Sequence, residues 1–157
     1  MSASKTLATA LSAALIALPV LAQDAPRPSY GPSITTDAAK RIAAGVLKEC
    51  AANRWNVAVA VVDTAGGLVY YERMEDTQSA SYDIAIMKAK TAAMYRRTTR
   101  VFTDVINKTP ATATLPGVVA SPGGVPIFVG GKIVGAVGVS GVTGDQDEQC
   151  AKAGIGG

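Results

Sequence analysis

Five basic residues lie close together in the second half of the chain, interleaved with hydroxyl-bearing side chains. The basic residues are Lys88, Lys90, Arg96, Arg97 and Arg100, and the hydroxyls belong to Thr91, Tyr95, Thr98 and Thr99. Arginine guanidinium groups form paired, charge-assisted hydrogen bonds with carboxylates. The stretch therefore predicts a site for an anionic ligand that needs no metal. The alternative is a solvated helix face followed by a basic turn.

The sequence contains no histidine. A Ser-His-Asp triad, an HExxH zinc site and an imidazole-ligated heme therefore cannot be built from this chain. Asp145, Asp147 and Glu148 could provide a general acid and base. Their position also fits the start of a helix, with Asp145 and Glu148 forming a capping box.

Cys50 and Cys150 are the two cysteines of the sequence, and neither belongs to a CxxC pair. A thioredoxin-like redox site and a four-thiolate zinc site are therefore disfavoured. In an exported protein the two cysteines are candidates for a disulfide. The alternative is a pair of buried free thiols.

Residues 1–22 have the features of a secretory signal peptide. Lys5 precedes an apolar stretch, and Val20, Leu21 and Ala22 form a small-residue cleavage site. A retained membrane anchor is the alternative. We expect cleavage after Ala22 and a periplasmic or secreted protein without membrane attachment after cleavage.

The remaining chain is long enough for one domain. Residues 23–34 are rich in proline and predict an irregular arm, and residues 35–157 predict a single domain. The net charge of +3 is too small to indicate a nucleic-acid binder.

Apolar periodicity predicts the elements that position these residues. An amphipathic helix, capped by Thr35 or Thr36, ends near Cys50, and a hairpin joins strands at 57–62 and 68–74. A helix capped by Ser79 or Ser81 follows, then a short helix over 101–108 and a Pro- and Gly-rich loop over 109–124 with room for a short strand at 118–120. A second hairpin, 125–129 with 132–140, turns at Gly130 and Gly131 and leads into the last helix. This order predicts an α+β domain, with a mainly antiparallel sheet of about five strands and helices packed on its faces.

Two patterns within these elements concern packing. The alanines of the predicted helix that Ser79 or Ser81 caps suggest close contact with another backbone. Gly135, Gly138 and Gly141 lack the GxGxxG order of a dinucleotide site, and they more simply allow a helix or another subunit to approach the sheet.

Three segments, VAVAVVDTAGGLVYYERMED, KAKTAAMYRRTT and GGVPIFVGGKIVGAVGVSGVTGDQDEQCAKAG, resemble the GlcG/HbpS family over essentially the whole chain after the leader. The resemblance implies a profilin-like layered sandwich, a homo-oligomer and a role in heme binding, release or breakdown. The family motif has an aromatic residue, two further residues and a Pro-Thr pair. Here it reads Tyr95, Arg96, Arg97, Thr98 and Thr99, with Thr98 in place of the proline. The resemblance thus makes Thr99 a candidate heme contact and a weak candidate ligand of the heme iron. The alternative is a helix cap or a surface residue.

A tyrosine phenolate is the stronger oxygen donor for ferric heme that this chain offers. Tyr95, within the motif, is a candidate ligand of the heme iron, and Tyr70, Tyr71 and Tyr82 are further candidates. For each of them the alternative role is packing. Met74, Met87 and Met94 could offer sulfur, although core packing explains their spacing.

The leading hypothesis is an exported heme-binding protein that sequesters, delivers or helps degrade heme. The cofactor-binding residues would be Thr99, Arg96, Arg97, Tyr95 and Lys88. One rival is an enzyme or accessory protein acting on a small carboxylate of the glycolate type, a chemistry the resemblance also suggests. The other is a structural oligomer without a ligand.

Overall fold

A computed structural model describes residues 26–156 of the chain. The predicted signal peptide and the first residues of the arm lie outside these described residues. The elements follow the order that the sequence predicts: α1 (Thr36–Ala52), β1 (Ala58–Val62), β2 (Leu68–Arg73), α2 (Ser81–Tyr95), α3 (Arg100–Lys108), the 3-10 helix η1 (Pro110–Thr114), β3 (Gly124–Val129), β4 (Lys132–Ser140) and α4 (Gly144–Gly156). Within residues 26–156 no helix has both the length and the apolar character needed to cross a membrane.

The four strands form one sheet in the order β2-β1-β4-β3, and every neighbouring pair is antiparallel. The described part of the chain thus has four strands, and the expectation of about five is wrong. Residues 118–120 stay irregular because the loop is held by a helix side chain. The Thr91 hydroxyl accepts a hydrogen bond from the Val119 amide at 3.1 Å and lies 2.8 Å from the carbonyl oxygen of Gly117.

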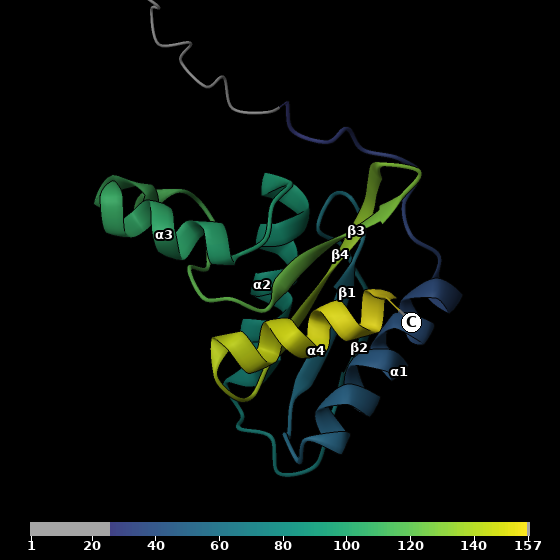
Figure 1. Ribbon diagram of the computed structural model, residues 1–157. Coiled ribbons are helices and arrows are strands. Elements are labelled where there is room, and N and C mark those ends of the chain that lie inside the picture. The colour runs from purple at the N-terminus through teal and green to yellow at the C-terminus, as the bar shows by residue number, and fades with distance from the viewer. Residues whose placement is uncertain (1–25, 157) are drawn as a thin grey trace, which may run out of the picture.

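Helices cover both faces of the sheet, so the α+β class is confirmed. In Figure 1, α1 and α4 lie together on one face and α2 lies on the other, while α3 projects to the side. The core beneath α1 and α4 is built from valines, and the core beneath α2 is built almost entirely from alanines. β1 is buried along its whole length because it is central in the sheet and covered on both sides.

The helix starts differ in part from the sequence predictions. The Thr35 side chain caps α1 as expected by accepting from the Ala38 amide. α2 has no side-chain cap, and Ser81 lies buried with its hydroxyl 3.2 Å from that of Ser140. The predicted serine cap of α2 is therefore wrong.

The last helix begins at Gly144, two residues earlier than the predicted capping box requires. Thr143 and Gln146 form the reciprocal pair of hydrogen bonds that was expected from Asp145 and Glu148. Those two carboxylates instead face Arg100 across the α3–α4 boundary. A capping box is therefore present at the start of α4, as predicted, but the residues predicted to form it are wrong.

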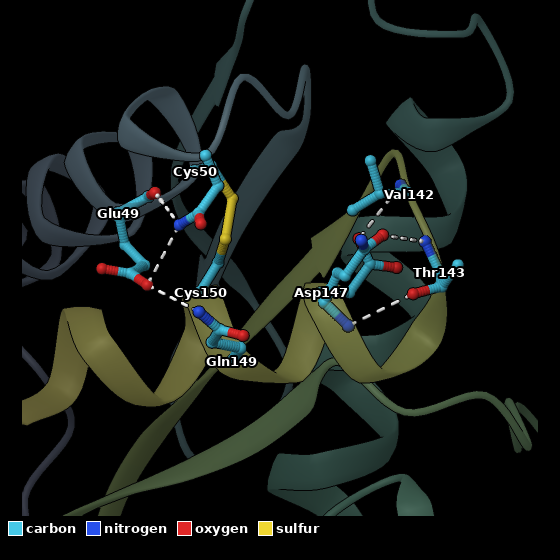
Figure 2. Close-up of a disulfide and its surroundings, with 9 residues drawn as sticks. Glu49, Cys50, Val142, Thr143, Asp147, Gln149 and Cys150 are labelled. Carbon is cyan, nitrogen blue, oxygen red and sulfur yellow. Dashed lines mark hydrogen bonds between the residues drawn. A yellow bond between two sulfur atoms is a disulfide. The ribbon is translucent and has the colours of Figure 1, made fainter.

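Cys50 and Cys150 are joined by a disulfide in the structure, with their Cα atoms 5.7 Å apart. The bond ties the end of α1 to the middle of α4, as Figure 2 shows. Beside it, the Gln149 side-chain amide donates to the Glu49 carboxylate at 2.8 Å, which adds a polar contact between the same two helices.

Candidate functional site

The structure divides the basic stretch into residues with and without carboxylate partners. Lys88 is almost fully buried, and its Nζ donates to Asp147 Oδ2 at 2.8 Å and to the carbonyl oxygen of Val139 at 3.1 Å. Lys88 therefore connects α2 to β4 and α4 and does not lie with the arginines.

Arg100 is also engaged by acidic side chains. Its guanidinium group contacts Asp145 and Glu148, and these two hydrogen bonds raise the pKa of the arginine. Its charge is therefore neutralised within the protein, at the surface where α3 meets α4.

Arg96 and Arg97 lie at an open pocket of about 350 Å³, which we call the cationic pocket. It is formed by the end of α2, the turn that follows, the apolar side of α3, η1 and the N-terminal arm. The lining residues are Arg27, Met94, Tyr95, Arg96, Arg97, Phe102, Val105, Thr112 and Leu115. Positive charge and apolar surface thus meet in one place, as in sites for ligands that have a hydrophobic body and a carboxylate.

Local backbone geometry turns the first of these arginines away from the helix. Arg96 ends α2 in the left-handed conformation, at φ 57°. Its guanidinium carbon lies 5.6 Å from the centroid of the Tyr30 ring, and its NH1 donates to the carbonyl oxygen of Pro28 at 3.4 Å. The arm therefore supports Arg96 from one side.

The other two arginines approach the pocket from different elements. The guanidinium carbon of Arg97 lies 5.6 Å from the centroid of the Phe102 ring, a cation–π distance. Arg27 comes from the arm and donates to the carbonyl oxygen of Tyr95 at 3.1 Å. Within residues 26–156, the ion pairs involve other basic residues, so these three guanidinium groups have no carboxylate partner there.

Tyr95 lines the pocket with its ring in edge-to-face contact with Phe102, at 5.3 Å between centroids. Its hydroxyl donates to the carbonyl oxygen of Pro116 at 2.8 Å. An iron contact by this oxygen would require that hydrogen bond to break.

Thr99 lies outside the lining of the pocket. Its side chain is fully buried, its Oγ1 accepts from the Gly124 amide at 2.9 Å, and its own amide donates to the Gly124 carbonyl at 3.0 Å. In this arrangement Thr99 fixes the turn between α2 and α3 to the start of β3. The structure therefore brings Tyr95, Arg96 and Arg97 together and leaves Thr99 and Lys88 apart from them.

The other tyrosines lie on or beside β2. The Tyr70 hydroxyl donates to Glu72 at 2.7 Å, and this hydrogen bond raises the pKa of the tyrosine. The Tyr71 hydroxyl is buried and has no hydrogen-bond partner among residues 26–156, and burial raises its pKa. Its ring packs edge-on against Tyr82. None of them lines the cationic pocket.

A second pocket of similar volume lies between the arm, α1 and the β3–β4 hairpin. Its lining includes Ile34, Ile42, Phe128, Val129 and Ile155 and contains no charged residue. Its polar side chains are the uncharged Ser33 and Thr35, so charge distinguishes the cationic pocket from it.

Sequence reasoning missed Arg27 and Phe102 as pocket residues. Arg27 belongs to a segment without periodicity, and no local pattern indicates where such an arm lies. The sequence did offer an indication for Phe102, because this residue lies in the short helix directly after the basic turn. The burial of Lys88 could also have been predicted from the sequence. Lys88 lies three residues after Ala85 and four before Ala92, on the face of α2 that packs against the sheet.

The fold and the pocket define a small layered α+β domain with a cationic, partly aromatic pocket. The model of the family described as "Haem degrading protein HbpS-like" matches residues 34–156. The chain is 42% identical to protein GlcG of Escherichia coli K12 over 100 residues, which are 63% of this chain and 74% of GlcG. It is 35% identical over 131 residues to an uncharacterized 15.0 kDa protein from the dhaT-dhaS intergenic region of Citrobacter freundii, covering 78% of this chain and 90% of that protein.

The fold is shared with solved structures of the same group. The crystal structure of a double mutant of Streptomyces reticuli HbpS aligns with a TM-score of 0.76 and 31% identity over 89% of this chain and 96% of that chain. The protein belongs to the HbpS-like family, as the resemblance of its sequence segments to GlcG and HbpS implied.

Proposed function

We propose that this protein is an exported heme-binding protein that holds its ligand in the cationic pocket and sequesters, delivers or helps degrade heme. The observation that carries the proposal is the set of arginines without carboxylate partners beside an aromatic and aliphatic surface. The description of the family as haem-degrading supports the choice of ligand.

The residues of the pocket match the two chemical parts of heme. Arg96 and Arg97 would bind the propionate carboxylates, because both retain guanidinium donors that no acidic side chain in the described chain engages. Phe102, Val105 and Leu115 offer apolar surface to the porphyrin ring. For the iron, the lining supplies the hydroxyl of Tyr95 and the thioether of Met94, which are both known types of heme ligand.

Export is supported by two features. Residues 1–22 have the pattern typical of a leader for secretion, and the disulfide between Cys50 and Cys150 is of the kind that persists outside the reducing cytosol. We also propose a homo-oligomer, because several large apolar side chains are exposed on the protomer, among them Met87, Met94, Phe128 and Val129.

A titration of purified apo-protein with hemin tests the proposal. We expect a shifted Soret band that saturates at a fixed ratio of heme to protein. Arg97→Gln should weaken binding by about tenfold, which corresponds to about 1.4 kcal/mol. Arg41→Gln, on the outer face of α1, removes the same charge away from the pocket and should leave the affinity unchanged. A spectrum that never saturates would reject the proposal.

Two further variants examine the iron ligand in the same titration. Tyr95→Phe changes the spectrum of the bound heme only if the phenolate coordinates iron. Thr99→Val does so only if its hydroxyl is released from Gly124 and reaches the iron.

A small carboxylate is the second candidate ligand. The pocket volume of about 350 Å³ lies at the small end of the usual range for ligand pockets, so a compact acid would fit within it while a porphyrin would extend beyond it. Thermal-shift measurements with glycolate, in the absence of heme, test this second candidate. A ligand that binds specifically raises the melting temperature of the protein.

A further inference from the structure

The N-terminal arm over residues 26–34 is fixed to the end of α2, beside the cationic pocket. The Tyr30 hydroxyl lies 2.9 Å from the carbonyl oxygen of Ala93 and 3.1 Å from that of Met94, and Arg27 donates to the carbonyl oxygen of Tyr95. The last carbonyl groups of a helix have no partner within the helix. The arm therefore provides donors for the end of α2 that the helix itself lacks.

Backbone hydrogen bonds hold the same segment against the sheet. The Ile133 amide donates to the carbonyl oxygen of Ser29, and the Gly31 amide donates to that of Ile133. Figure 1 shows the arm, in purple, passing the β3–β4 hairpin before it enters α1. The position of Arg27 and Tyr30 is thus set by contacts on two sides.

We infer that Arg27 contacts the anionic ligand directly, that Tyr30 positions Arg96, and that the three guanidinium groups make the pocket select ligands with two carboxylates over ligands with one. This inference rests on the proposed function, because it concerns the same pocket. It goes beyond the family resemblance, since Arg27 and Tyr30 precede residues 34–156, which the family model matches.

Donor counting supports the selectivity. Each guanidinium group has five N–H donors. The structure gives Arg27 one acceptor, the carbonyl of Tyr95, and gives Arg96 one acceptor, the carbonyl of Pro28. The remaining donors of three neighbouring cations exceed what a single carboxylate can accept, whereas two carboxylates can engage all three.

The test compares hemin with its monomethyl ester, which keeps one charged propionate, and with its dimethyl ester, in which both propionates are uncharged. The wild type should bind hemin more tightly than the monomethyl ester, and Arg27→Gln should lose most of this difference. Dissociation constants are measured for the wild-type protein, Arg27→Gln and the control Arg41→Gln, at low and high salt. We expect Arg27→Gln to bind hemin about tenfold more weakly than the wild type while binding the dimethyl ester equally well. The difference should shrink at high salt, because the pocket is open to solvent. Arg27→Lys should recover part of the loss, since it restores the charge without the bidentate geometry.

The positioning role of Tyr30 is tested with a double-mutant cycle. Tyr30→Ala should weaken hemin binding in the wild-type background and have no further effect in an Arg96→Gln background, since the ring acts through Arg96. Equal losses in both backgrounds would overturn this role.

The outcomes distinguish this inference from the proposed function. If the wild type binds hemin saturably and Arg27→Gln binds it equally well, the inference is wrong and the proposed function stands. Equal weakening by Arg27→Gln and Arg41→Gln would show a general charge effect and would also overturn the inference. If the wild type does not bind hemin saturably, the proposed function itself fails.

Discussion

Cations from one short stretch of sequence have different roles because their surroundings differ. Lys88 is buried against Asp147, while Arg96 and Arg97 face a pocket without a carboxylate partner in the described chain. Burial raises the pKa of the Asp147 carboxyl, and the hydrogen bond and charge of Lys88 oppose that rise. Asp147 also accepts from the Val142 amide at 3.2 Å (Figure 2). The Lys88–Asp147 ion pair therefore links α2 to β4 and α4. Arg96 and Arg97 remain available for a ligand.

Replacement of Lys88 by methionine tests this structural role. Lys88→Met leaves a buried carboxyl without its cation, so we expect a loss of about 3–5 kcal/mol in the free energy of unfolding near neutral pH. The pKa of Asp147 should rise further in this variant. A carboxyl whose pKa is raised by folding contributes stability at low pH that is lost as the pH increases through the raised pKa. The loss should thus be larger at about pH 8 than at about pH 5, as measured by urea unfolding.

The double variant Lys88→Met/Asp147→Asn provides the control. It keeps an acceptor for Val142 and removes the titrating group, so the extra pH dependence should disappear. If Lys88→Met were as stable as the wild type at both pH values, the structural role given to the pair would be wrong.

At the residue scale, the sequence predicts some residues of the cationic pocket but not its full lining. Arg96, Arg97 and Tyr95 were selected by residue type and by the family motif, and they lie together. Arg27 could not be selected, because its place depends on long-range contacts with α2 and β4. Lys88 was grouped with the arginines because it is near them in sequence, although helical periodicity places it on the buried face of α2.

The element that positions the pocket is α2, and it lies unusually close to the sheet. A Cβ atom built on Gly138 of β4 would collide with the backbone carbonyl of Ala85 and the amide of Ala89. Small side chains on both elements permit this approach. The end of α2, and with it the turn that carries Arg96 and Arg97, is placed by this contact.

A single methyl group at this contact should therefore be costly. We expect Gly138→Ala to lower the free energy of unfolding by about 1–3 kcal/mol, because α2 has to move away from β4. Gly156→Ala adds a methyl group where no atom lies within 4 Å, and it should change stability by less than about 0.5 kcal/mol. Chemical denaturation of both variants checks the difference, and equal stability would contradict the close packing.

The succession of helices and strands could be predicted because apolar periodicity is a local property of the sequence. The hairpin of β3 and β4 and the capped start of α1 follow from residue types alone. The absence of a strand at 118–120 could not be foreseen, since it depends on Thr91 binding the loop from a distant helix. The register of the last cap was decided in the same way, because Arg100 attracts Asp145 and Glu148.

At the scale of the whole molecule, the disulfide and the cationic pocket lie on opposite sides of the sheet. The disulfide joins α1 to α4 on one face (Figure 2), and the cationic pocket adjoins the end of α2, which covers the other face (Figure 1). The two cysteines are 100 residues apart in sequence, so the bond closes most of the domain into a loop.

Removal of the disulfide should destabilise the fold without altering the pocket. In the chain-entropy model a loop of this length contributes about 4.7 kcal/mol, and measured losses are typically about 2–5 kcal/mol. Cys50→Ala/Cys150→Ala should therefore unfold at lower urea concentration. Its affinity for hemin, measured at a temperature where it is folded, should equal that of the wild type. Full stability of this variant would contradict the role given to the bond.

The most direct test of the ligand and its place is the hemin dissociation constant of the wild type set against that of Arg97→Gln, with Arg41→Gln measured in parallel. We predict saturable binding by the wild type and by Arg41→Gln, with binding about tenfold weaker in Arg97→Gln. Identical dissociation constants for all three proteins, or no saturable binding by any of them, would contradict a heme site in the cationic pocket.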